Sequence, residues 1–153
     1  MLPTLSARWL SIAVAVGALC CSSCGGGKGY YPVRGRVLVN GKPAEGITVV
    51  LTPQGDHNPA PEQPAGGTRA DGSFELRTYV AKDRASYAGA PAGTYVVTCV
   101  WYPPDMGSQP GLMTALPDKL GGKYANPATS PLRVTIPPHA VELPPFELEA
   151  NVR

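Results

Sequence analysis

Apolar and polar residues alternate in several short stretches of the chain, and the clearest stretch covers residues 93–101. A Pro/Gly turn leads into this run of β-branched and aromatic residues, which is typical of a buried central strand. Successive side chains of a strand point to opposite faces. The two faces would carry Tyr95, Val97, Cys99 and Trp101, and Val96, Thr98 and Val100, respectively.

Further strands are predicted by the same alternation, and the turn residues between them indicate how the strands connect. The dipeptides Asn40-Gly41 and Asp71-Gly72 are strong signals for hairpin turns. The polar stretches 54–67 and 79–89 read as a loop and a connection. Six or seven short strands without a helical stripe predict an all-β fold, a β-sandwich. Besides 93–101, the expected strands are 31–39, 47–52, 73–77, 132–136 and 146–149.

Composition supports this fold class and narrows the range of partners. The 153 residues include 18 glycines and 18 prolines, but 43% of the chain is hydrophobic, so the glycines and prolines read as turns. The formal net charge is +2, and no basic block stands out. Nucleic-acid binding needs a positive stripe, so we expect no nucleic-acid partner.

The N-terminus has the pattern of an export signal. Arg8 supplies a positive charge, and residues 9–21 then contain no charged residue. This run is shorter than the roughly 20 apolar residues of a transmembrane helix, so an uncleaved membrane anchor is the weaker alternative. We predict a signal peptide over residues 1–23 and a glycine-rich spacer over 24–30.

Three cysteines lie at the end of this segment, and the small residues Ser22 and Ser23 directly precede the last of them, Cys24. This pattern resembles the lipobox of bacterial lipoproteins, in which a cysteine after small residues is lipidated, whereas Cys21 stands where that motif prefers leucine. The resemblance implies lipid attachment at Cys24 and a membrane partner, since two acyl chains hold a protein stably on a membrane. An ordinary cleaved signal peptide is the alternative.

The remaining candidates for chemistry are few. A mature chain that starts at Cys24 would keep one further cysteine, Cys99, expected to be a buried packing residue rather than a reactive thiol. His57 and His139 have no second ligand at metal-binding spacing. We therefore predict no catalytic residue, no metal and no cofactor, and a protein that is not an enzyme.

A long segment without periodicity follows Tyr102, and segments of this kind are often functional. It mixes apolar and charged residues, which suits a recognition surface. The alternative is that its apolar residues fold back over one end of the sandwich, with Asp118 and Lys119 or Lys123 forming a solvated pair. The candidate recognition loop comprises Tyr102, Met106, Asp118, Lys119, Lys123 and Tyr124.

Four short motifs and a later segment, 118–127, follow one another along the chain. The motifs are Val33-Arg34-Gly35-Arg36-Val37, Asn40-Gly41-Lys42-Pro43, Asp71-Gly72-Ser73-Phe74 and Pro91-Ala92-Gly93-Thr94-Tyr95. In this order they resemble the carboxypeptidase regulatory-like domain of small bacterial lipoproteins. The likeness spans about residues 31–149 and implies a transthyretin-like (prealbumin-like), seven-stranded Greek-key sandwich, here assigned to residues 31–150. It also implies a noncatalytic module outside the cytoplasm.

Two functional hypotheses follow. The first is a lipid-anchored module on the periplasmic or outer face of the cell envelope, with a binding or structural role towards protein or polysaccharide. The second is a small-ligand carrier or hydrolase of the transthyretin-related kind, which would need a lined pocket with convergent polar groups. Pairing of a partner strand with an exposed sheet edge is a third idea, but Pro53 and Pro137 near strand ends disfavour it.

Overall fold

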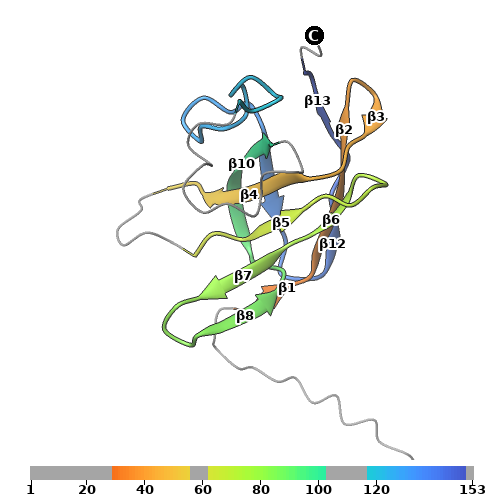
Figure 1. Cartoon of the computed structure of the whole chain (residues 1–153). Coiled ribbons are helices and arrows are strands. Elements are labelled where there is room, and N and C mark those ends of the chain that lie inside the picture. The colour runs from red at the N-terminus through yellow and green to blue at the C-terminus, as the bar shows by residue number, and fades with distance from the viewer. Residues whose placement is uncertain (1–28, 56–61, 103–116, 151–153) are drawn as a thin grey trace, which may run out of the picture.

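The computed structural model describes residues 29–55, 62–102 and 117–150, and these form an all-β fold without a helix (Figure 1). The arrangement, mostly of antiparallel strand pairs in several sheets, is consistent with the predicted β-sandwich. The lipidation candidate Cys24, Met106 of the recognition loop, and His57 lie outside the described residues.

The larger sheet has six strands in the order β11-β10-β4-β5-β7-β8, and every neighbouring pair is antiparallel. Its longest pair joins β10 to β4, from Tyr95 opposite Pro53 to Trp101 opposite Ile47. The strands are β4 (Ile47–Pro53), β5 (Ala65–Gly67), β7 (Arg77–Val80), β8 (Ala85–Ala88), β10 (Gly93–Trp101) and β11 (Arg133–Ile136).

The second sheet is built around β2, which pairs in parallel with β12 and β13 and antiparallel with β3 and β6. A separate two-stranded pair joins β1 to β9. The strands of the second sheet are β2 (Val33–Val39), β3 (Lys42–Pro43), β6 (Ser73–Glu75), β12 (Val141–Glu142) and β13 (Phe146–Leu148), and the separate pair is β1 (Tyr30–Tyr31) and β9 (Ala90–Pro91).

The hydrophobic core lies between the two sheets, because the longer strands β2, β4 and β10 each direct apolar side chains inward. On β2, buried valines alternate with exposed Arg34 and Arg36, as the period of two predicts. The central strand β10 is buried on both faces from Tyr95 to Cys99, which confirms its predicted place in the core. Each fully buried aliphatic side chain contributes about 1.5–3 kcal/mol. The core cluster includes Val33, Val37, Ile47, Val49, Leu51, Phe74, Val97, Cys99, Phe146 and Leu148.

The predicted Asn40-Gly41 turn is confirmed, but the hairpin that it closes is short. Asn40 and Gly41 have φ values of 50° and 77°, the left-handed conformation that a two-residue hairpin turn needs. The returning strand β3 has two residues, after which the chain crosses to the larger sheet and forms β4. The turn signal is local, whereas the choice of sheet depends on distant partners.

Three segment predictions are wrong in detail. Residues 65–67 are not loop but strand β5, whose small residues pair with β4 and allow the backbone of Glu75 to come close. The run 73–77 is not one strand, because it breaks at Leu76 into β6 and β7, which join different sheets. Residues 79–89 are not a plain connection, because β7 and β8 form an antiparallel hairpin there. Stacking of Tyr87 on Tyr30, with ring centroids 4.6 Å apart, supports β8 from outside the hairpin.

Candidate functional site

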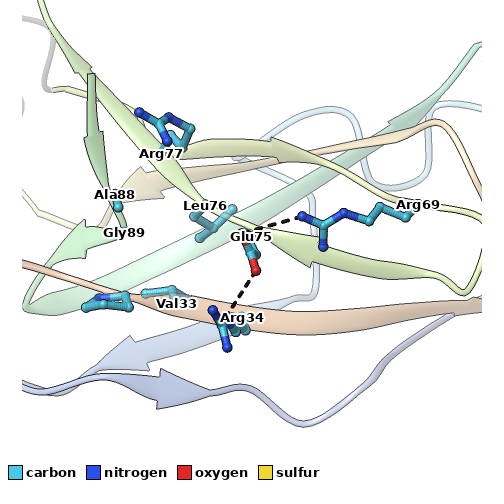
Figure 2. A pocket seen from close by; sticks show the side chains of 9 residues that line it. Val33, Arg34, Arg69, Glu75, Leu76, Arg77, Ala88 and Gly89 are labelled. Carbon is cyan, nitrogen blue, oxygen red and sulfur yellow. Dashed lines mark ion pairs between the residues drawn. The ribbon is translucent and has the colours of Figure 1, made fainter. Parts of the chain in front are cut away.

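The two sheets are joined at one corner, where the chain passes from β6 to β7 through Leu76. The amide of Leu76 donates to the carbonyl of Val33 at 3.1 Å, and the carbonyl of Leu76 accepts from the amide of Gly89 at 2.7 Å. Leu76 is itself buried, so the corner is fixed both by packing and by hydrogen bonds. A surface hollow of about 420 Å³ opens at this corner, between β2, β6, β7 and the end of β8 (Figure 2).

Ionic side chains converge on one side of this hollow. Arg34 and Glu75 are direct partners on β2 and β6, so both side chains lie on the same face of the sheet. Glu75 accepts contacts from two guanidinium groups: Arg34 Nε lies 3.2 Å from its Oε1, and Arg69 Nη2 lies 3.5 Å from its Oε2 (Figure 2). One carboxylate is therefore shared between two arginines.

Local structure explains why Arg69 can reach Glu75. The turn around Asp71 and Gly72 folds the chain back, and the amide of Arg69 donates to the carbonyl of Ser73 at 2.8 Å. The Asp71 carboxylate accepts from the amide and the hydroxyl of Ser73, at 3.0 and 2.6 Å. These two bonds, with the hydroxyl contributing most, lower the pKa of Asp71. The turn thus places Arg69 beside β6.

A third arginine, Arg77, lines the hollow from β7. Its Nε lies 3.5 Å from the hydroxyl of Ser86, and its Nη2 donates to the carbonyl of Ser86 at 3.2 Å. The neighbouring strand β8 therefore orients this guanidinium. With three arginines and Glu75 as the one acidic residue in its lining, the hollow carries an excess of positive charge.

The described residues of the candidate recognition loop have different structural roles. Asp118 is not paired with Lys119 or Lys123, so that expectation is wrong. Its Oδ1 accepts from the amides of Trp101 and Leu120, at 2.9 and 3.0 Å, and its Oδ2 accepts from the amide of Gly122 at 3.0 Å. Asp118 organises a turn because a carboxylate is a strong acceptor for several amides at once.

The two lysines of this segment lie against other groups. Lys119 places its Nζ 4.7 Å from the centre of the Trp101 ring, a cation–π contact. Lys123 forms an ion pair of 2.7 Å with Glu149, which raises the pKa of Lys123 and lowers that of Glu149. Trp101 is also held by its indole Nε1, which donates to the carbonyl of Glu45 at 2.9 Å.

Among the described residues of the segment, Leu120 and Tyr124 fold back onto the sandwich, as the alternative interpretation expects of the apolar residues. Leu120 and Tyr124 are buried members of the core cluster. The Tyr124 hydroxyl accepts from the amide of Glu149 at 3.2 Å, and the carbonyl of Tyr124 accepts from the amide of Cys99 at 3.0 Å. Tyr124 is therefore part of the core, while Tyr102 stays partly exposed at the end of β10.

Cys99 is a buried free thiol, and burial raises its pKa to about 12, with a smaller contribution from the charge of Asp118. It therefore packs as an apolar residue, as predicted. His139 is exposed. Among the described residues, no group of three histidine, cysteine or acidic side chains could hold a metal ion. The same parts of the chain include no helix of the length and apolarity needed to cross a membrane.

Comparison with known proteins adds no relative: no protein-family model matches the chain, and no curated protein matches it. The charged group at the corner was not foreseen from the sequence. Arg34 and Glu75 occupy polar positions of alternating strands, where an exposed charge is ordinary. Only the register between β2 and β6 brings them together.

Proposed function

We propose that the protein is a noncatalytic β-sandwich binding module of the bacterial cell envelope. In this proposal residues 1–23 direct export, Cys24 carries a lipid anchor, and residues 24–30 hold the domain away from the membrane. The domain is of the carboxypeptidase regulatory-like, transthyretin-like kind that its motifs resemble, with Greek-key topology. Its ligand is a protein or a polysaccharide of the envelope.

One observation carries this proposal: side chains from both sheets fill the described interior, and charged side chains are displayed on the surface. Ile47, Leu51 and Phe74 are at most 1% exposed and pack between the layers. The Phe74 ring stacks on Phe146 with centroids 5.9 Å apart. A filled core favours recognition at the surface over a small-ligand carrier that encloses its cargo.

The anchor is tested by the intact mass of the mature protein from membranes of its native host, beside a Cys24→Ala variant. We expect a chain that starts at Cys24 and carries a diacylglyceryl group, and we expect this species to be absent from the variant. An unmodified chain in the soluble exported fraction would contradict the anchor. A full-length chain in the cytoplasm would contradict the whole proposal.

The binding role is tested by sedimenting the purified mature protein with envelope fragments from which lipids have been extracted. Retention that survives delipidation supports a protein or polysaccharide ligand. Protein left entirely in the supernatant, with a small molecule bound at stoichiometric amounts in its mass spectrum under native conditions, would favour the carrier instead.

A further inference from the structure

The corner hollow has more hydrogen-bond donors than its own acceptors use. Each guanidinium group has five N–H donors. The ion pairs with Glu75 are formed by one nitrogen of Arg34 and one of Arg69, at 3.2 and 3.5 Å. Arg77 adds a third positive charge to the lining, but Ser86 holds its guanidinium, which points away from Glu75 (Figure 2). Planar N–H pairs of this kind match the two oxygens of a carboxylate, sulfate or phosphate.

Glu75 is a weakly held counter-ion for these arginines. The side chains of Arg34, Arg69 and Glu75 are 70%, 60% and 46% exposed, so water competes for every charge in the cluster. Exposed ion pairs contribute little to stability. An incoming anion can therefore replace Glu75 at one or both guanidinium groups without disturbing the fold beneath.

We propose that this hollow binds an oxyanion group of an envelope component, with Arg34 and Arg69 as donors, Arg77 as a further positive charge in the lining, and Glu75 as the resident anion that the ligand displaces. The inference rests on the proposed function for the source of the ligand, but the site itself can be tested on the purified protein. Carboxylate, sulfate and phosphate share the required chemistry, and the experiment distinguishes them.

The dimensions of the hollow fit a single charged unit of a larger molecule. Its volume of about 420 Å³ is enough for one sugar residue or one phosphate ester. Because the hollow lies at the surface, the rest of a polymer could continue into solvent on either side. Pro32 and Ala88, which are both exposed in the lining, provide apolar contact area next to the arginines.

A second acidic residue, Glu142, lies next to an arginine of the hollow. Glu142 of β12 is the register partner of Arg34 on the side of β2 opposite to Glu75. It is exposed and forms no ion pair within the described residues. Glu142 thus lowers the positive potential near Arg34 but does not occupy its hydrogen-bond donors.

The test measures binding of the mature protein, purified in neutral detergent, to three anions at about 0.15 M salt, where distant charges are screened. The probes are polygalacturonate for carboxylate, dextran sulfate for sulfate and inorganic phosphate, and neutral dextran serves as the blank. The variants are Arg34→Gln, Arg69→Gln, Arg77→Gln and Glu75→Gln. Arg36→Gln is the matched control, because Arg36 lies on the same face of β2, is exposed and does not line the hollow.

We expect at least one of the three anions to bind, and Arg34→Gln and Arg69→Gln each to weaken that binding by about tenfold. Arg77→Gln should have a smaller effect, because Ser86 holds the Arg77 guanidinium. Arg36→Gln should change it by less than about twofold, because an exposed charge outside the site acts only through screened attraction. Glu75→Gln should strengthen binding, since it removes the competing carboxylate. That gain separates an oxyanion site from a cation site, in which Glu75→Gln would weaken binding.

Three results would overturn the proposal. They are the absence of binding to every probe, an Arg36→Gln effect as large as that of Arg34→Gln, and weaker anion binding by Glu75→Gln. A urea unfolding midpoint near that of the unmodified protein, measured for each variant, shows that the fold is kept. An anchored, envelope-associated protein that fails these tests would retain the proposed function and lose only this site. A protein that binds anions through the hollow but is not exported would retain this site and lose the proposed function.

Discussion

Glu75 and Asp118 are carboxylates at the periphery of the same fold, but their oxygens have different partners. Asp118 accepts from three backbone amides, at 2.9 to 3.0 Å, in the turn that follows β10. Glu75 faces two guanidinium groups at the ends of long, exposed side chains. Both residues are charged and partly accessible, so composition and exposure alone do not distinguish them.

The difference lies in what happens when each carboxylate leaves its partners. Backbone amides are fixed by the fold, so without Asp118 the amides of Trp101 and Leu120 would remain as partly buried donors lacking an acceptor. Guanidinium groups on flexible side chains can turn to water or to another anion. The Asp118 carboxylate therefore belongs to the structure, whereas the Glu75 carboxylate is exchangeable and marks a surface suited to binding.

The largest loss of stability should come from a change in the backbone of the corner, at Gly89, where the chain is tightly packed. A Cβ on Gly89, which has φ +93°, would collide with the carbonyl oxygen of Tyr31. We expect Gly89→Ala to lower the free energy of unfolding by about 3 kcal/mol in urea titrations. Gly67→Ala is the control, because a Cβ there meets no atom within 4 Å. Equal stability of the two variants would contradict a rigid corner.

Removing the Asp118 carboxylate should have the next largest effect. We expect Asp118→Ala to lower the free energy of unfolding by about 2 kcal/mol, because three amides lose a charged acceptor. Asp118→Asn keeps one acceptor oxygen and should lose about half as much. Chemical denaturation of the three proteins measures this series. An Asp118→Ala protein as stable as the unmodified one would show that water replaces the carboxylate at no cost.

The Cys99 thiol should make the stability of the protein depend on pH, and Asp118 contributes to this dependence. Its pKa in the folded protein is about 12, raised first by burial and then by Asp118. An unfolded thiol ionises near pH 9, so the unfolded state loses its proton first and stability falls as pH rises between 9 and 12. We expect this thiol to account for about 1 kcal/mol of the loss between pH 9 and 10.

Unfolding titrations at pH 8, 9 and 10 on the unmodified protein and on Cys99→Ala isolate this contribution. The variant should be less stable at every pH but should lose less stability between pH 9 and 10. Parallel pH profiles for the two proteins would mean that the thiol is not buried in solution.

Substitution of Glu75 should change stability least. We expect Glu75→Gln to change the free energy of unfolding by less than about 0.5 kcal/mol, since both of its ion pairs are exposed. Thermal and urea unfolding of this variant, next to Asp118→Asn, compares the two carboxylates directly. A loss as large as that of Asp118→Asn would place Glu75 in the structure rather than in an exchangeable site.

The sequence predicts those parts of the fold that depend on local patterns. The alternation around Val37 and Val97, and the left-handed turn at Asn40, need only neighbouring residues to be recognised. The break at Leu76 is different, because its amide bonds to Val33 on a distant strand. No local feature marks that change of sheet, and residues 73–77 therefore look like one continuous strand.

The arginine–glutamate cluster at the corner escapes prediction from the sequence for the same physical reason. Arg34 and Glu75 come together through the register of β2 and β6, which the sequence does not specify. A long irregular segment marks Asp118 as a candidate, but its three amide partners depend on how residues 118–122 pack beside Trp101. Tyr124 lies in the same irregular segment, yet it is only 3% exposed because it packs against the core.

The short pair of β1 with β9 has a consequence for mechanical load. A force applied at Gly29 enters the fold through Tyr30 and Tyr31, which pair with Pro91 and Ala90, and passes through Pro32 to β2. A ligand held at Arg34 would meet that force only five residues from its entry point. Tension between the proposed membrane tether and a ligand bound to Arg34 would therefore run through residues 29–34, whereas the load borne by Arg69 would pass into the turn before β6.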